Sequence, residues 1–328
     1  MSDSQTKSIL SLLPPRRYTS LRTEPDCYGA SYLLSLRARL PFVPRSLAHW
    51  QHGWIYNNLD IQFPQIFGIP SNYPFLVATT KHSAYLASCG IKSIPVGHPL
   101  TYASLLDTID IPTIPNSILF MPPHGLEYTT ENWSETDILE SFIRTSTSYS
   151  YIAACIHPDS VKKGQWIHQL NKFEIPYFLG AEMQDSNSLT RMVRMLSSFS
   201  AVAACSMGSH IAYAAFCGCT VNIIEPFCEW HPQYLKSDEL FKNYPEILEY
   251  FIWLYSKRFA QQNFPFLFSS LYKQKADFSF RAWARDELGH SNIISIRDLS
   301  RLLGWRPIPQ LKDMLSRSRR FLHKNLAT

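Results

Sequence analysis

The chain has 328 residues, of which 45% are hydrophobic and 17% are charged, and its formal net charge is +5. This composition is typical of a globular protein and excludes a disordered one, and the length fits two domains of about 150 residues each. The mild positive charge gives no reason to expect nucleic acid as a partner.

The start of the chain has no basic segment followed by a long apolar core, and no window approaches the roughly 18 uninterrupted apolar residues of a membrane span. We therefore expect a cytoplasmic protein. The seven cysteines lie largely in apolar runs, which predicts reduced core thiols. Cys217 and Cys219 are too close in sequence for a zinc knuckle, so no metal site is expected.

In chain order, residues 28–40 could form a helix after a start that is rich in Pro and Arg. Apolar segments then predict a strand over 75–78, a helix over 81–89 and a strand over 93–96. This β-α-β rhythm indicates parallel strands joined by crossover helices. Two prolines make residues 108–116 the predicted linker.

A second set of alternating elements follows. The predicted strands are 117–121, 151–156, 177–179, 201–205 and 221–224, and the predicted helices are 134–145, 164–173, 188–199 and 210–216. The sequence thus predicts an α/β fold with two Rossmann-like, doubly wound domains that face a central cleft, followed by C-terminal helices. The expected boundaries are 1–115, 116–245 and 246–328.

Residues 197–226 contain the strongest sequence evidence for a binding site. A small-residue turn, Ser206 to Ser209, lies between a predicted strand and a helix that starts near His210. Gly208 is expected to allow a tight turn, and the unpaired N–H groups at the helix start would bind an anion such as a phosphate. The two serines would add hydroxyl groups, although helix capping explains them as well.

His157 and Glu225 end two other strands of the same predicted sheet. Pro158 fixes the backbone after His157, so the imidazole would be held at the sheet edge, where it could donate to a phosphate oxygen or protonate a leaving phosphate. A strand-end histidine satisfied by the backbone is the alternative. Glu225 is at a position suited to a ribose hydroxyl.

Two further segments supply candidate acid–base residues. His52 lies between Trp50 and Trp54, which could stack on a sugar face while His52 acts as a general base. The alternative is a half-buried structural histidine. His124 and Glu127 share one strand-end loop and could form an acid–base couple, a composition that is also common in turns.

Absent motifs narrow the chemistry. The chain lacks the patterns GxxxxGK[ST], GxGxxG, GxSxG and HExxH, and it has no Asp-x-Asp at a strand end. P-loop kinases, NAD-dependent dehydrogenases, α/β-hydrolases, zincins and metal-clamped diphosphate transfer are therefore disfavoured. A metal-independent transferase fits better.

With these motifs in order, the chain resembles bacterial surface-polysaccharide glycosyltransferases of the two-Rossmann (GT-B) type over roughly residues 48–230. The likeness lies in Gln51-His52-Gly53, Gly97-His98-Pro99-Leu100-Thr101-Tyr102, Pro122-Pro123-His124-Gly125 and Gly208-Ser209-His210-Ile211-Ala212-Tyr213. It implies a nucleotide-sugar donor on the second domain and a glycan or lipid-linked acceptor on the first. The donor is a substrate, and no cofactor is expected.

The His-Pro pair and the downstream serines are similar to those that sialyltransferases and Kdo transferases use to hold a CMP-sugar phosphate. The residues expected to bind the donor are His124, His157, Ser206, Gly208, Ser209, His210 and Glu225, and those expected to act in catalysis are His52, Glu127 and His157. The acidic, glycine-containing segment that supplies the base in those enzymes has no match here. The base is therefore either His52 or Glu127.

Other functions remain open at this stage. The His-Gly segment is also similar to one in polyol-phosphate transferases of teichoic-acid type, where a histidine of the first domain is the base. A non-catalytic glycan- or nucleotide-binding protein of an envelope assembly complex and a nucleotide-sugar epimerase are the further alternatives.

The C-terminal segment 312–324 is rich in Lys and Arg and contains one acidic residue, Asp313. Leu315 and Leu322 are seven residues apart and would share one face of a helix with a cationic rim. We expect weak contact with an anionic membrane surface, which would place the protein at the inner face of the cytoplasmic membrane. The alternative is that these leucines pack back on the body of the protein.

Overall fold

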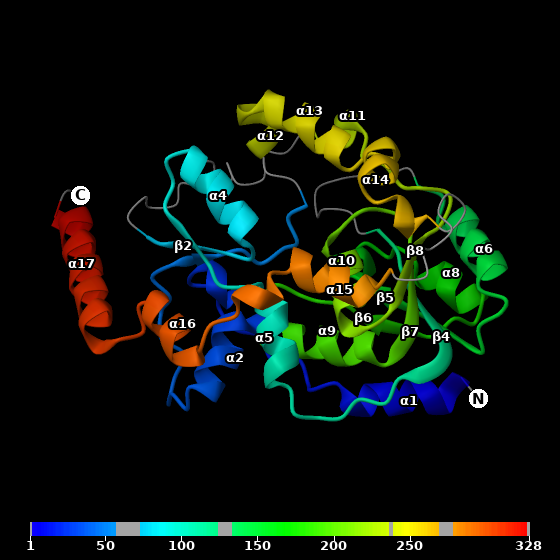
Figure 1. Cartoon of the computed structure of the whole chain (residues 1–328), viewed down its shortest axis with the longest axis horizontal. Coiled ribbons are helices and arrows are strands. Elements are labelled where there is room, and N and C mark those ends of the chain that lie inside the picture. The colour runs from blue at the N-terminus through cyan, green and yellow to red at the C-terminus, as the bar shows by residue number, and fades with distance from the viewer. Residues whose placement is uncertain (1, 57–72, 124–132, 236–238, 269–277, 327–328) are drawn as a thin grey trace.

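The computed structural model describes residues 2–56, 73–123, 133–235, 239–268 and 278–326. These residues form an α/β structure with two parallel β-sheets, one of three strands and one of five (Figure 1). The predicted α/β class with parallel strands is confirmed.

The smaller sheet has the order β1-β2-β3, with strands His49–Trp50, Phe75–Val77 and Ser93–Pro95. Helix α4 (Thr80–Ser88) joins β2 to β3, and α5 (Pro99–Leu106) follows β3. Both helices start with a side-chain cap, because Thr79 and His98 accept hydrogen bonds from backbone N–H groups of the first turn. Strands β2 and β3 therefore each lead into a helix at their carboxyl ends.

The larger sheet has the order β6-β5-β4-β7-β8, with strands Tyr177–Leu179, Tyr151–Ile156, Ile114–Met121, Phe199–Ala204 and Thr220–Ile223. The chain runs outward from β4 to β5 and β6, then crosses to β7 on the other side of β4 and continues to β8. The strand order thus reverses between β4 and β7. In open parallel sheets, ligands bind beyond the carboxyl ends of the strands at such a switch point.

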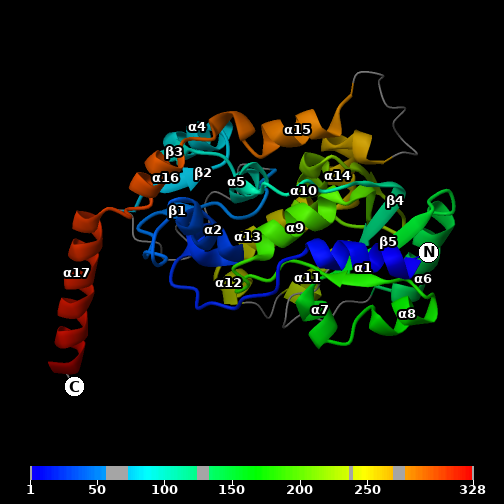
Figure 2. The same ribbon diagram turned by 90° about the horizontal axis from the view of Figure 1, so that it is seen from below.

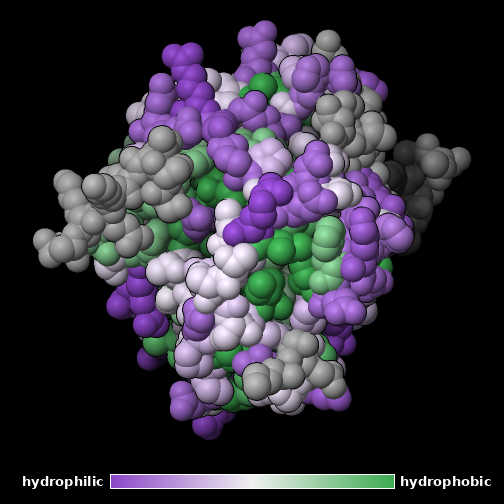
Figure 3. All heavy atoms as spheres, turned by 90° about the vertical axis from the view of Figure 1, so that its right-hand side faces the viewer, coloured by the Kyte–Doolittle hydropathy of each residue, from purple (hydrophilic) through white to green (hydrophobic). Residues whose placement is uncertain are grey.

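Alternate residues of the larger sheet face two different helix layers. Ile118 and Phe120 belong to a buried cluster with α6 (Glu135–Thr145) and α8 (Ile167–Lys172). Leu119 and Met121 belong to a second cluster with α9 (Ser188–Ser197) and α10 (Ser209–Cys217). Side chains of a strand alternate between the two faces of the sheet, and helices cover both faces here. The sequence of β4 is therefore a nearly continuous apolar run. On the side that carries α6 and α8, apolar atoms gather near the middle within a hydrophilic surround (Figure 3).

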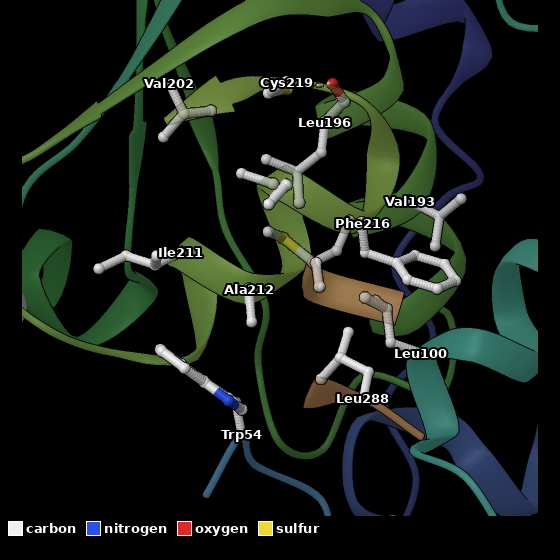
Figure 4. Packing of buried hydrophobic residues seen from close by; sticks show 14 of the residues in the cluster. Trp54, Leu100, Val193, Leu196, Val202, Ile211, Ala212, Phe216, Cys219 and Leu288 are labelled. Carbon is white, nitrogen blue, oxygen red and sulfur yellow. Dashed lines mark hydrogen bonds between the residues drawn. The ribbon is translucent and has the colours of Figure 1, made fainter. Parts of the chain in front are cut away.

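The cluster on α9 and α10 extends to the smaller sheet without interruption. Leu100 of α5, Trp54 and Leu288 lie against side chains of α9 and α10 (Figure 4). Helix α10 therefore packs against the larger sheet with one part of its surface and against residues of the smaller sheet's layer with another.

The remaining elements lie around these layers (Figure 2). They are α1 (Ser2–Leu12), η1 (Glu24–Gly29), α2 (Ala30–Arg37), α7 (Pro158–Lys162), α11 (Pro232–Leu235), α12 (Glu239–Asn243), α13 (Pro245–Leu254), α14 (Lys257–Asn263), η3 (Pro265–Leu267), α15 (Phe280–Glu287), η4 (His290–Asn292), α16 (Ile296–Leu302) and α17 (Pro307–Leu326).

Two element predictions were wrong in detail. The helix predicted over 164–173 starts only at Ile167, because Trp166 adopts a positive φ of 68° and its N–H donates to Glu135 instead (2.8 Å). The predicted linker ends at Ile114, where β4 begins. The N–H of Ile114 donates to the carbonyl of Ser198 (2.9 Å), so pairing with β7 starts before Pro115.

The turn at Gly29 joins the N-terminal segment to the larger sheet's layer. A Cβ at Gly29 would lie 1.9 Å from the carbonyl oxygen of Ser186, and its φ is +85°. Gly90 has a similar φ of +75° but meets nothing within 4 Å.

We therefore expect Gly90→Ala to lower the free energy of unfolding by about 1 kcal/mol through backbone strain alone. Gly29→Ala should cost about 1–3 kcal/mol more, because backbone atoms must move to admit the methyl group. Urea unfolding of both variants tests this. Equal losses would show that the close approach to Ser186 is not a constraint on the fold.

Candidate active site where the two sheets meet

The loop that follows β1 carries His52. The side chain of Gln51 holds this loop in place, since its Oε1 accepts from the N–H of Ala78 (3.0 Å) and its Nε2 donates to the carbonyl of Gly53 (2.9 Å). Ala78 follows β2, so the two strand ends are joined by a side-chain amide. The backbone around His52 is thereby fixed at the carboxyl edge of the smaller sheet.

A carboxylate from outside both sheets orients His52. Oε1 of Glu24, the first residue of η1, lies 3.1 Å from Nδ1 of His52, and Oε2 lies 3.3 Å from Nδ1 of His49. A carboxylate only accepts hydrogen bonds when ionised, so Nδ1 of each imidazole is the donor. His52 is then left with Nε2 for a substrate, as in a general base that a carboxylate orients.

The pKa of Glu24 shows that its contacts with the two histidines outweigh the effect of its burial. Burial alone would raise it, but the hydrogen bonds from His49 and His52, together with their charges, outweigh burial and lower the pKa to about 2. Glu24 therefore remains ionised across the neutral range. It is able to stabilise an imidazolium on His52 whenever that ring takes up a proton.

A partly buried hydrogen-bond chain connects the His52 loop to α10. Nδ1 of His98 accepts from the N–H of Leu100 (3.0 Å), so in the neutral ring Nε2 carries the proton. Nε2 lies 3.1 Å from the hydroxyl oxygen of Tyr213, and that hydroxyl donates to the carbonyl of His52 (3.0 Å). Burial lowers the pKa of His98 to about 3, which keeps the ring neutral.

A second contact between the sheets involves Ser209. Its Oγ accepts from the N–H of Trp54 (2.9 Å), so the serine predicted to bind a phosphate is also part of the junction. Trp50 and Trp54 are only 1% and 4% exposed, which means that the predicted stacking of these two rings on a sugar is wrong. The Trp54 ring instead packs among Tyr56, Phe264 and Trp283.

Tyr28 lies beside the His52 loop, with its ring centroid 5.9 Å from that of His52. Burial raises the pKa of Tyr28 to about 12, and the charges of Cys27 and Asp159 add to this rise. Tyr28 therefore stays protonated in the neutral range beside the His52 ring.

His157 starts helix α7. Its Nδ1 accepts from the N–H of Asp159 (3.2 Å) and lies 3.5 Å from Oδ2 of that residue. The half-buried ring thus serves as a helix cap, the structural alternative raised by the sequence. Since β5, β4 and β7 are neighbours and strands are spaced by about 4.8 Å, His157 and Ser206 lie at the same sheet edge, two strands and about 10 Å apart.

Gly208 has a different role from the one predicted. Its φ of 168° is extended backbone, so no left-handed turn requires glycine here. What glycine provides is space, because a Cβ would lie 2.8 Å from Nδ1 of His210. The ring of His210 therefore lies close to Gly208 at the start of α10.

The other predicted donor residues are less central. Glu225 is exposed, pairs with Nζ of Lys257 (2.6 Å) and accepts from the N–H of Phe227 (3.1 Å). His124 and Glu127 lie outside the described residues, so the structure leaves their predicted roles as predictions. Within the described ranges, no group of three or more His, Cys, Asp or Glu side chains could hold a metal ion.

Sequence reasoning missed Glu24, His49 and Tyr213 as members of this site. Glu24 precedes Pro25, a frequent pattern at helix starts, so its sequence context carries no distinct signal. Tyr213 was noted within the motif at Gly208, and its spacing of four residues from Ser209 would have placed both on one face of a helix.

Comparison with known proteins gives no family for the chain. No protein-family model matches it, and no curated protein matches it with significance. Among the described residues, no helix is long and apolar enough to cross a membrane.

The pKa of Glu24 generates a prediction about stability and pH. A folded-state pKa of about 2, below the ordinary 4.5, means that ionised Glu24 stabilises the fold above pH 4.5 and that this contribution is lost as the pH falls toward 2. At pH 6, Glu24→Gln should therefore lower the free energy of unfolding by on the order of 1–3 kcal/mol. The difference from the unaltered protein should shrink between about pH 4.5 and 2.

Thermal or urea unfolding at a series of pH values measures this difference. Glu140→Gln is the matched control, because Glu140 is an exposed carboxylate on α6. A difference for Glu24→Gln that does not change with pH would contradict the assigned pairing with the histidines.

The chain through Tyr213 generates a second prediction. Tyr213→Phe leaves the N–H of buried His98 and the carbonyl of His52 without the hydroxyl, so we expect a loss of about 1–3 kcal/mol in unfolding free energy. Tyr18→Phe removes an exposed hydroxyl that donates to Glu182, and its effect should stay within about 0.5 kcal/mol. Similar losses in both variants would show that the chain contributes nothing to the junction.

Proposed function

We propose that the protein is a glycosyltransferase that moves a sugar from a nucleotide-sugar donor to a glycan or a lipid-linked acceptor. The observation that carries the proposal is His52, held by the Glu24 carboxylate at Nδ1 and only partly buried, at the place where the two sheets meet. This geometry supports His52 as the base of the proposed reaction.

In the proposed reaction, Nε2 of His52 takes the proton of an acceptor hydroxyl as its oxygen attacks the anomeric carbon. The bond between that carbon and the nucleotide's phosphate oxygen breaks, and the electron pair stays on the phosphate. Glu24 stabilises the imidazolium that forms. The reaction needs no redox partner, because the proton goes to His52 and the negative charge goes to the leaving phosphate.

The donor would bind at the switch point of the larger sheet. The N–H groups at the start of α10 face the edge beyond β7, where the helix dipole favours a phosphate, and Ser206 lies at the same edge. His157, two strands away, would donate from Nε2 because its Nδ1 is used as a cap. A CMP-sugar remains the favoured donor by the resemblance to sialyltransferases and Kdo transferases, and the two-domain GT-B arrangement is part of this proposal.

A polyol-phosphate transferase is the second candidate, and the same dyad favours it. There the acceptor hydroxyl, deprotonated by His52, would attack the phosphorus of the polyol phosphate rather than an anomeric carbon. The bond from that phosphorus to the bridging oxygen of the donor's CMP would break, and CMP would leave with the electron pair. Histidine is the base that the resemblance to those enzymes implies, and a histidine held by a carboxylate is what the structure contains.

The test is a panel of donors with the purified protein. CMP-, UDP-, GDP- and dTDP-sugars and a CDP-polyol are titrated calorimetrically, and slow donor hydrolysis is followed in the same samples. We expect micromolar to millimolar binding of one nucleotide class and turnover by the unaltered protein.

His52→Gln should retain nucleotide binding and lower turnover by roughly 100-fold or more, in the range that general-base catalysis supplies. His168→Gln, at an exposed histidine of α8, is the matched control and should leave both unchanged. If none of these nucleotides binds, the proposal is overturned. Binding without turnover would favour the non-catalytic alternative.

A further inference from the structure

Helix α17 presents an apolar stripe to solvent. Ile308, Leu311, Met314 and Leu315 are 69%, 53%, 51% and 50% exposed. Their spacing of three, three and one residues places all four on one side of the helix. The helix extends beyond the rest of the chain in two perpendicular views (Figures 1 and 2), so the stripe is not explained by packing on the body.

The opposite side of α17 fixes its orientation. Nε2 of Gln310 donates to the carbonyls of Arg45 and Gly304 (2.8 Å each). Asp313 is buried, accepts from Nε of Arg317 (2.8 Å) and lies 3.9 Å from Nε of Arg45. These contacts attach the start of the helix to the body on the face that lacks the stripe, and the apolar face is thereby directed outward.

The charge on α17 is of one sign. Lys312 and Arg317 are exposed, and the sequence adds Arg319, Arg320 and Lys324 further along the helix. The helix has a single acidic residue, Asp313, which Arg317 already neutralises. At 100° per residue, exposed Lys312 falls next to the stripe, and position 319 lies on the same side of the helix.

We infer that α17 is a docking surface for an anionic lipid bilayer, with the stripe inserted among the lipids and the basic residues at the headgroups. The 20 residues of α17 span about 30 Å, long enough to lie in the interfacial plane. A second copy of the chain would bring two cationic helices together, which opposes pairing through this face. The inference is independent of the proposed reaction, since it uses none of the residues of the site.

Vesicle co-sedimentation of the full chain tests it. We expect binding to equimolar phosphatidylglycerol and phosphatidylcholine vesicles at low salt, with roughly fivefold tighter partitioning for each basic residue that reaches the surface. Binding to phosphatidylcholine alone should be at least tenfold weaker, and about 1 M salt should remove most of the difference.

Leu311→Ser combined with Leu315→Ser should lower the partition coefficient at least tenfold without changing the thermal midpoint, because both leucines are exposed. Arg319→Ala combined with Arg320→Ala should reduce binding to the anionic vesicles and leave binding to phosphatidylcholine vesicles unchanged. Leu105→Ser is the matched control, since Leu105 is 60% exposed on α5, away from α17, and it should bind as the unaltered protein does.

Equal binding of the unaltered protein to both vesicle types, or binding to neither, would overturn the inference whatever the variants do. Light scattering after gel filtration adds an independent criterion. If the leucine substitutions dissociate an oligomer and leave vesicle binding unchanged, the stripe is a contact between copies of the chain and the membrane assignment is wrong.

Discussion

The candidate site depends on the hydrogen bonds of the Tyr213 hydroxyl group. This hydroxyl group connects α10 of the larger sheet's layer to the carbonyl of His52 and to His98, whose side chain is fully buried. Because Nδ1 of His98 accepts from an N–H of α5, the direction of every hydrogen bond in the chain is determined. Another arrangement would leave a polar group of this chain without its partner, at a cost in free energy. The hydrogen bonds therefore favour one position of the His52 loop relative to α10.

The two histidines on Glu24 differ in what surrounds them. His49 stacks on Phe75 with ring centroids 5.0 Å apart, and its side chain is 14% exposed, against 38% for His52. His49 is thus well placed to retain the carboxylate, whereas His52 has a ring edge open to a ligand. In the proposed reaction, His49 would hold Glu24 while His52 acts on the acceptor.

The sequence predicted the larger sheet well because its signals are local. Strands covered on both faces are short apolar runs, and each ends in a residue type that marks a turn, as at His157 and Ser206. The site could not be predicted in the same way. Glu24 and His52 are 28 residues apart, and only the packing of η1 through Gly29 brings them together. The sequence predicts that the aromatic residues beside His52 stack on a sugar, but Trp54 fills the core between the sheets.

The position of Ser209 ties the proposed donor site to His52 through one helix. Ser209 and Tyr213 are four residues apart on α10, so both lie on the face turned toward the His52 loop. If the first turn of α10 binds the phosphate of the proposed donor, a shift of this turn would reach the N–H of Trp54 through Ser209 and the carbonyl of His52 through Tyr213. Both contacts lie on the C-terminal side of His52 in the chain. In the proposed reaction, α10 would therefore connect donor binding to the position of His52.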